Sequence, residues 1–270
     1  MKSFIRYWAA AVLVTTGLCQ NTFAGEASVK QELAPTGKLR VAIAVAPTPS
    51  ATYVVKNPDG GYRGVPIDLG RMLAEKLKVP VEYVAYNASG EITAAADKGA
   101  WDVAFIPVDD ERKKFVDFSN AFHILKSTYL VAPNSSIKTI DDANRPGVRI
   151  AGIPGTTTNR ASVATATRAT HIDVKSVGEA ADLMKAGKID AIGLGRETIG
   201  GLAALLPGSR VLDGAFWNST TAIAVPKNHD AARGYATTFI EEVKASGVVR
   251  KAFDNVGLTT SEVAGPGMKP

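Results

Sequence analysis

The chain has 270 residues, with 31 lysines and arginines against 26 aspartates and glutamates and a formal net charge of +5 at pH 7. Charged residues are 21% of the total and do not gather into the basic stripe that binding to nucleic acid requires, so a nucleic-acid partner is excluded. The length is enough for one large or two modest hydrophobic cores.

Residues 1–24 have the features of a removed export signal. Lys2 and Arg6 precede an apolar run over residues 8–18, which is too short for a stable membrane anchor. The sequence TFA at 22–24 then offers the small-x-small pattern that signal peptidase cleaves. We therefore expect a periplasmic protein whose mature chain begins near Gly25.

The only cysteine, Cys19, gives this segment a second interpretation as a lipoprotein acylation site. The preceding residues 16–18 (TGL) match such a site poorly, so we predict a mature protein without lipid. After the signal no stretch approaches 18 apolar residues, which predicts solubility. Residues 25–36 are interpreted as an N-terminal extension.

The first part of the mature chain predicts a strand, a helix and a second strand. Residues 39–45 form a β-branched apolar run that ends before two prolines. From Val65, apolar residues recur at the spacing of one helix face, and residues 79–84 read as a short strand. This is the unit from which parallel sheets are built, so the fold class is α/β.

Two segments resemble each other. Residues 94–104 and 180–191 both run from an alanine-rich helix through Gly-x-x-Asp into a buried strand, with the glycine suited to a left-handed helix cap. Two lobes of similar construction explain this best, although a chance match of so short a motif is the alternative.

The lobes are expected to be joined by two strands that form a hinge. The predicted crossings are residues 128–132 and 221–226, and the helices after Asp230 should pack back on the first lobe. We therefore assign residues 37–130 and 223–257 to lobe 1 and residues 135–220 to lobe 2. The glycines and prolines near the end predict a disordered tail over 258–270.

Five segments in order resemble the family 3 solute-binding proteins of bacterial ABC transporters, in the polar amino-acid binding group. They are residues 64–69, 99–132, 152–157, 187–191 and 222–227. The resemblance runs from about residue 38 to residue 258. It implies a type II periplasmic-binding-protein fold and a monomer that captures a small carboxylate-bearing solute, an amino acid or related organic anion, by hinge closure. Its expected partner is an ABC permease at the inner membrane.

In that family an arginine just before a VDFS-type segment holds the ligand carboxylate. VDFS stands here at 116–119, and Arg112 has the matching position. Taken alone, the charge run 109–114 reads as a solvated turn. A guanidinium presents two parallel donors to a carboxylate, which lysine does not, so Arg112 is preferred over its lysine neighbours. The usual Ser/Thr-rich stretch before it is replaced by residues 105–108 (FIPV).

The GTTT sequence at 155–158 precedes a helix expected from about residue 160. Backbone N–H groups and hydroxyls at a helix start can bind an anion, which makes Thr156 and Thr157 candidate ligand contacts. Ordinary capping by one threonine is the alternative. Of the aromatic residues that flank the ligand in the family, the nearest candidate here is Tyr53.

The acidic residue that holds the ligand's ammonium group in the family is replaced here by Gly195 or Arg196. We therefore predict that Arg112 and Arg196 both face the cleft and favour a ligand more negative than a neutral amino acid. In the competing interpretation, Arg196 pairs internally with Glu197 or Asp190.

The sequence gives little support for an enzyme. The three histidines lie in separate segments, and neither a metal-ligand cluster nor a cofactor motif is evident, so no metal or cofactor is expected. A dehydratase-like enzyme on the same fold, using Glu197 and His123, is one alternative. A soluble ligand-presenting or accessory subunit is another.

Overall fold

The computed structural model describes residues 18–270, with side chains from residue 25 onward. The predicted export signal therefore lies, for its greater part, outside the described residues. The helices are α1 (Leu18–Leu33), α2 (Val65–Leu77), α3 (Ser89–Ala94), α4 (Thr157–Thr165), α5 (Val177–Lys185), α6 (Arg196–Leu205), α7 (Asp230–Ala245) and α8 (Val248–Asp254).

The described strands are β1 (Leu39–Val45), β2 (Tyr53–Lys56), β3 (Tyr62–Arg63), β4 (Val81–Tyr86), β5 (Val103–Pro107), β6 (Val116–Val131), β7 (Arg149–Gly152), β8 (Thr170–Asp173), β9 (Ala191–Gly195), β10 (Arg210–Val211), β11 (Trp217–Pro226) and β12 (Glu262–Val263). Their order is β3-β2-β1-β5-β11-β6-β9-β7-β8, with β4 beside β1 and with β10 and β12 beside β6. The class is α/β, as the sequence predicts.

Local sequence explains where the first elements begin and end. Strand β1 is almost wholly buried, which suits its continuous apolar run and its parallel neighbours β2, β4 and β5. Helix α2 has a proline in its first turn and ends at Lys78 in the left-handed conformation. Its apolar face buries Leu69, Leu73 and Leu77 against β1 and the C-terminal helices.

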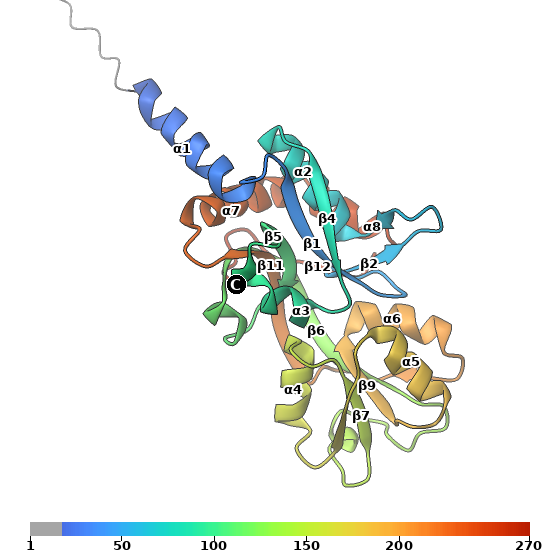
Figure 1. Cartoon of the computed structure of the whole chain (residues 1–270). Coiled ribbons are helices and arrows are strands. Elements are labelled where there is room, and N and C mark those ends of the chain that lie inside the picture. Colours follow the sequence, from blue (N-terminus) through green and yellow to red (C-terminus); the bar gives the residue numbers. More distant parts are fainter. Residues whose placement is uncertain (1–17) are drawn as a thin grey trace, which may run out of the picture.

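The two long strands β6 and β11 run antiparallel and connect the two halves of the sheet. Strand β11 pairs with β5 through Thr221–Ala224, whereas β6 pairs with β9 through Ser127–Val131. In Figure 1 they pass from the part containing β1, β4 and α7 to the part containing β7, β9 and α4–α6. Both crossing strands begin earlier than their apolar segments suggest.

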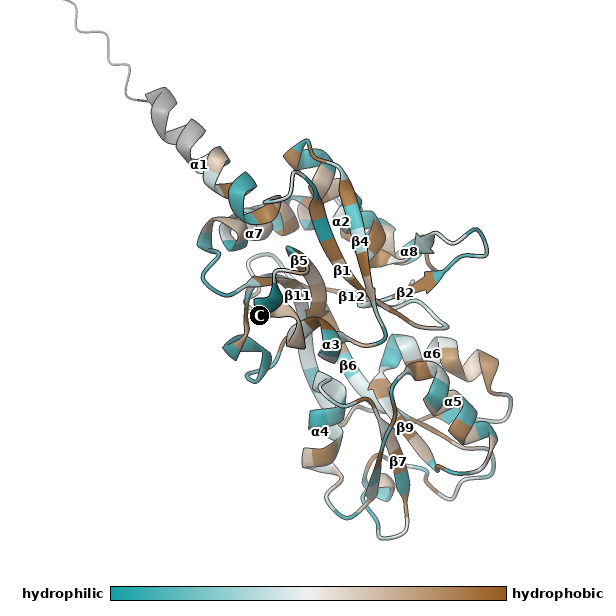
Figure 2. Ribbon diagram, viewed as in Figure 1, coloured by the Kyte–Doolittle hydropathy of each residue, from teal (hydrophilic) through white to brown (hydrophobic). Residues whose placement is uncertain are grey.

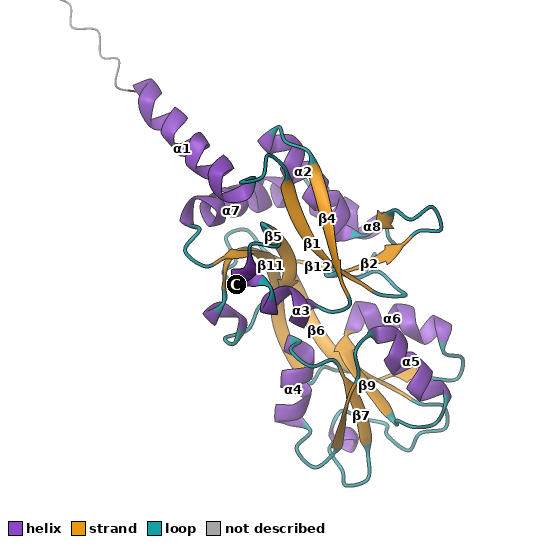
Figure 3. Cartoon of the chain, viewed as in Figure 1, coloured by secondary structure: helices purple, strands orange, loops and turns teal. Residues whose placement is uncertain are grey.

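Helices cover the sheet in both parts of the molecule (Figure 3). One hydrophobic cluster joins α2, α7 and α8 to β1, β5 and β11, and a second surrounds β7 and β9. A third contains residues from both parts, including Ile92 and Trp101 on one side and Ile153 and Ile192 on the other. Figure 2 shows the hydrophobic residues concentrated on the strands and on one face of helices such as α5. Within residues 18–270, no helix combines the length and the apolar character needed to cross a bilayer.

The C-terminal segment is ordered, which corrects the prediction of a disordered tail. Strand β12 pairs antiparallel with β6, the Ala121 N–H donates to the Met268 carbonyl (2.9 Å), and Lys244 donates to the Gly265 carbonyl (2.9 Å). Its glycines and prolines suggest flexibility, but its backbone finds partners on a strand and a helix that are distant in sequence. Such contacts leave no local signal in composition.

Deleting residues 259–270 should therefore destabilise the protein. The deletion removes the β12 pairing and the bond from Arg250 to the Ser261 carbonyl, and each buried or partly buried hydrogen bond contributes about 0.5–1.5 kcal/mol. We expect a clear fall in the melting temperature measured by circular dichroism. Glu262→Gln is the control, because its ion pair with Lys126 is exposed and worth under about 1 kcal/mol. An unchanged melting temperature after deletion would show that the segment docks without stabilising the fold.

Candidate functional site

The predicted carboxylate-binding residue lies where several strands end. Arg112 begins a single 3₁₀ turn after β5, Ser89 begins α3 after β4, and Thr156 and Thr157 begin α4 after β7. Ligands of open α/β sheets bind beyond the carboxyl ends of strands, where backbone N–H groups and loop side chains converge. The topology thus brings together groups from residues 89, 112 and 157.

Arg112 is completely buried, unlike the other residues of its charge run. Its Nη1 donates to the Pro107 carbonyl (2.9 Å), and its Nη2 donates to Ser89 Oγ (2.7 Å) and to the Gly155 carbonyl (3.3 Å). Gly155 belongs to the loop that precedes α4, so the guanidinium connects the two parts of the molecule. The solvated-turn interpretation applies to Lys113 and Lys114 but not to Arg112.

The charge of Arg112 is not balanced by a close carboxylate. Among residues 25–270, no carboxylate oxygen lies within 4 Å of the guanidinium, and Nε has no hydrogen-bond partner. Burial lowers the pKa of Arg112 to about 10, an effect that the more distant charge of Asp109 opposes. A buried, unpaired cation is costly, and a bound anion is one way to relieve that cost.

Asp109 links the two parts of the molecule beside Arg112. One oxygen accepts the Arg112 backbone N–H (2.8 Å), and the other accepts Thr157 Oγ (2.7 Å) and Nε of Arg160 (3.0 Å), with Arg160 Nη2 also paired to it. Burial alone would raise the pKa of Asp109, but these hydrogen bonds outweigh it and hold the pKa below its usual value. The carboxylate therefore ties β5's loop to the start of α4.

Asp109→Asn should weaken this contact between the two parts of the molecule. Charge-assisted hydrogen bonds contribute about 1.5–3 kcal/mol, so we expect a larger radius of gyration in small-angle scattering and an affinity for ligand lower by about tenfold or more. Because the folded-state pKa is depressed, the contribution of Asp109 is present above about pH 4 and is lost as the pH falls through the lowered value. Asp110→Asn is the matched control, since its side chain is 99% exposed. Equal behaviour of the two variants would contradict the role of Asp109.

Thr156, Thr157 and Tyr53 line one small cavity of about 20 Å³ between the two parts. Its other lining residues are Ser50, Ala51, Thr52, Ser89, Pro107, Leu125, Thr158, Leu194, Gly195, Glu197 and Thr198. This volume holds about one water molecule. A ligand of amino-acid size would therefore enter only if the two parts separate first.

The three lining residues predicted from sequence have different roles in this structure. Thr156 is the N-cap of α4, since its hydroxyl accepts the Asn159 N–H (3.2 Å), which supports the capping alternative for that residue. Thr157 contacts Asp109 instead. Tyr53 is buried, which raises its pKa to about 12, against the opposing effect of the Arg112 charge.

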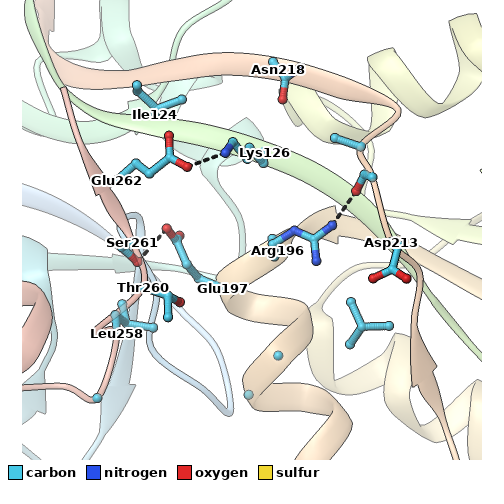
Figure 4. A pocket seen from close by; sticks show the side chains of 16 residues that line it. Ile124, Lys126, Arg196, Glu197, Asp213, Asn218, Leu258, Thr260, Ser261 and Glu262 are labelled. Carbon is cyan, nitrogen blue, oxygen red and sulfur yellow. Dashed lines mark hydrogen bonds and ion pairs between the residues drawn. The ribbon is translucent and has the colours of Figure 1, made fainter. Parts of the chain in front are cut away.

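Arg196 is not brought together with Arg112, which corrects the expectation of a doubly basic pocket. Its Nη2 donates to the Leu212 carbonyl (3.2 Å) and the Gly214 carbonyl, and its side chain lines a separate groove of about 900 Å³ beside the C-terminal segment (Figure 4). Arg196 is the first residue of α6, and successive helical side chains point about 100° apart, so Arg196 lines the groove alone, whereas Glu197 lines both the groove and the small cavity.

The competing interpretation, an internal pair of Arg196 with an acid, is not found either. Asp190 pairs with Arg149. Glu197 is held by His123 and Ser261. His123 is completely buried in β6, and its two ring nitrogens contact the Thr221 hydroxyl and the Glu197 carboxylate.

Sequence reasoning missed three residues of this site, namely Ser89, Asp109 and Arg160. Apart from the Arg112 N–H that Asp109 accepts, their partners lie 23 to 51 positions away along the chain, so no short motif contains both side chains of a pair. The position of Ser89, a few residues after a predicted strand of a parallel sheet, is the one signal that favours a role in binding. In residues 18–270 no cluster of three or more potential metal ligands is present.

Comparison with known proteins identifies a family for the chain. The model of the bacterial extracellular solute-binding proteins, family 3, matches residues 39–256. The chain is 25% identical over 227 residues to the L-arginine-binding protein of Pseudomonas aeruginosa, covering 80% of this chain and 86% of that protein. It is 24% identical over 206 residues to the ABC transporter glutamine-binding protein GlnH of Bacillus subtilis, covering 74% and 75%.

Solved structures show the same architecture. The ancestral amino acid-binding protein AncCDT-1, a precursor of cyclohexadienyl dehydratase, superposes with a TM-score of 0.75 at 26% identity, covering 84% of this chain and 98% of that one. The fold is therefore that of the type II periplasmic binding proteins, as the sequence predicts. With the family model matching from β1 to the residues after α8, the chain belongs to the bacterial extracellular solute-binding proteins of family 3.

Proposed function

We propose that this protein is the periplasmic substrate-binding component of an ABC transporter, which captures an amino acid or a related carboxylate by hinge closure and presents it to a permease. The observation that carries the proposal is Arg112, a buried guanidinium without a carboxylate partner among the described residues, at the contact between the two parts of the molecule. The named relatives bind arginine and glutamine, and both molecules carry a carboxylate.

The surroundings of Arg112 suit a carboxylate. Ser89 Oγ already accepts from Nη2 and has its own hydroxyl proton to donate, and Thr157 lies at the start of α4, where backbone N–H groups point outward. A carboxylate in the neighbouring cavity would reach donors from both parts. In this proposal a ligand that contacts both parts stabilises the closed form, whereas one that contacts a single part shifts nothing.

Binding is favoured over catalysis. The relatives carry the names of binding proteins, and the structural neighbour related to a dehydratase is itself described as an amino acid-binding protein. The dehydratase-like alternative therefore has little support. Secretion through a cleavable signal, a monomeric state and an inner-membrane permease partner belong to the proposal.

A thermal-shift screen tests the proposed function. The panel holds amino acids, dicarboxylates, small inorganic anions and neutral sugars, each at several concentrations. A ligand at a hundred times its dissociation constant adds about 2.7 kcal/mol to stability, which corresponds to a shift of several degrees for a protein of this size. We expect shifts with carboxylate-bearing compounds only. Shifts with sugars and none with any carboxylate would overturn the proposal.

A further inference from the structure

The small cavity that Tyr53 and Thr157 line has one charged side chain in its lining, Glu197 in the first turn of α6, and this side chain also lines the larger groove beside Arg196. Its side chain is 13% exposed, and among the described residues no lysine or arginine lies within 4 Å of its carboxylate. Burial alone would raise the pKa of Glu197, but its hydrogen bonds outweigh that effect and hold the pKa below its usual value. A buried carboxylate thus lines the same cavity as the threonines of α4.

One oxygen of Glu197 is held by Ser261, which lines the larger groove, and by His123. Oε1 accepts Ser261 Oγ (2.8 Å) and is paired with Nε2 of the buried His123 (Figure 4 shows the contact with Ser261). An ionised carboxylate only accepts hydrogen bonds, so Nε2 carries a proton. Nδ1 of His123 meets the Thr221 hydroxyl (3.1 Å), and a neutral imidazole therefore satisfies both contacts.

The other oxygen is nearly free. Oε2 has one partner among the described residues, the Ala51 N–H, at the long distance of 3.5 Å. A full-strength N–H···O bond is about 2.9 Å, so this oxygen retains most of its accepting capacity. Ala51 itself lines the cavity. The carboxylate therefore has one oxygen fixed by the hinge and the C-terminal segment and one oxygen available to a cationic group.

Position 195, where the sequence comparison expects an acid, is a glycine, and a larger residue there would require the Leu125 side chain to move. A Cβ added to Gly195 would meet Leu125 Cδ1 at 2.8 Å, closer than carbon atoms pack. Glu197 lies two residues further on and lines the cavity from the first turn of α6. Ser261, which fixes Glu197, lies beyond residues 39–256, the part that matches the family model, so this arrangement depends on a segment outside the shared region.

We propose that Glu197 receives a protonated amino group of the ligand, while His123 and Ser261 position its carboxylate. This inference rests on the proposed function, because it assumes that Arg112 takes the ligand carboxylate. With the Arg112 cation bonded to Ser89 in the cavity wall and the Glu197 anion lining the same cavity, the preferred ligand is a zwitterionic amino acid and not a dicarboxylate. This differs from the prediction made from the sequence, which favours a ligand more negative than a neutral amino acid.

The test compares three amino acids with the same acids lacking the α-amino group. The probes are L-alanine with propionate, L-glutamine with glutaramate, and L-arginine with 5-guanidinopentanoate, measured by titration calorimetry on the full mature chain. The wild-type protein should bind the amino acid of at least one pair about tenfold or more tightly than its partner, since each 1.4 kcal/mol is a factor of ten. Equal affinity within every pair overturns the inference without any variant.

Glu197→Gln then tests the residue itself, because it keeps the shape of the side chain and removes the charge. We expect the preference for the amino acid to fall by about tenfold or more, with the affinity for the deaminated acid nearly unchanged. Ser261→Ala should reduce the same preference by a smaller factor. A purely structural role of Ser261 would instead lower the affinity for both members of a pair equally. Glu262→Gln, in the neighbouring exposed ion pair, should leave it unchanged.

The outcomes distinguish a failure of this inference from a failure of the proposed function on which it rests. If Glu197→Gln binds both members of each pair like the wild type, and Arg112→Met still abolishes binding, the inference fails and the proposed function stands. If Arg112→Met binds the probes like the wild type, or if neither the six probes nor any carboxylate of the thermal-shift panel binds the wild type, the proposed function fails, and the inference fails with it.

Discussion

Arg112→Met is expected to abolish binding of every carboxylate ligand found in the screen. Arg112 is the one buried guanidinium at the contact between the two parts in residues 25–270, and methionine replaces its donors with an apolar chain of similar length. Truncating one partner of a buried, hydrogen-bonded charge pair costs about 2–5 kcal/mol, a loss of about 30-fold to several thousand-fold in affinity. Titration calorimetry with the best ligand of the screen measures the effect.

Two further variants make this result specific. Arg112→Lys keeps the charge but loses the two parallel donors, so it should bind more weakly than the wild type and more strongly than Arg112→Met. Arg71→Met is the matched control, because Arg71 is exposed and paired only with Glu75 on the outer face of α2. Unchanged affinity in Arg112→Met would show that the carboxylate-binding role does not transfer to this chain.

The unliganded Arg112→Met protein should still fold. Removing an unpaired buried charge is favourable, while the carbonyls of Pro107 and Gly155 and the hydroxyl of Ser89 lose a donor. The two effects oppose each other, so we expect a melting temperature close to that of the wild type. A loss of binding with an intact melting curve separates a binding role from a structural one.

Local patterns predicted the elements whose causes are local. Strand β1 and helix α2 follow from an apolar run and from a helical spacing of apolar residues, and their bounds agree with the sequence. The burial of Arg112 is different, because its charged neighbours indicate an exposed turn. Only the resemblance to a family singled it out, and the structure explains its burial by the strand ends that surround it.

Local sequence patterns did not predict the contacts between segments that are distant in sequence. The tail was expected to be disordered because its partner β6 lies more than 130 residues earlier. The position of Arg196 after β9 predicts a place in the cleft, but one residue along a helix changes the direction of a side chain by about 100°. Glu197, not Arg196, lines the small cavity. The lobe boundaries, residues 37–130 with 223–257 and residues 135–220, stay predictions.

Gly90→Ala is expected to hold the two parts of the molecule apart. Gly90 lies in α3, next to Ser89, and a Cβ added there would meet the Pro154 carbonyl oxygen at 2.8 Å and the Gly155 carbonyl carbon at 2.9 Å. Both are backbone atoms, so no side-chain rotation relieves the overlap. The loop before α4 must move away from α3 or the hinge must open.

Opening at the contact of Gly90 with residues 154–155 would affect ligand binding through Arg112. Opening at this point separates the Gly155 carbonyl from the guanidinium and Thr157 from Asp109, two contacts that close the site. We expect a larger radius of gyration in small-angle scattering and an affinity for ligand lower by about tenfold or more, because part of the binding energy must now overcome the overlap. Melting temperature should change little, since alanine is the better helix former.

Gly200→Ala is the matched control for this variant. It makes the same substitution in helix α6, but an added Cβ at position 200 meets no atom within 4 Å, so it should leave both the radius of gyration and the affinity unchanged. If Gly90→Ala binds ligand with wild-type affinity and keeps the wild-type radius, then the contact of α3 with residues 154–155 is not part of the ligand-bound form. Closure would then have to occur elsewhere along the hinge, and the argument that Arg112 acts by joining both parts around a ligand would fail with it.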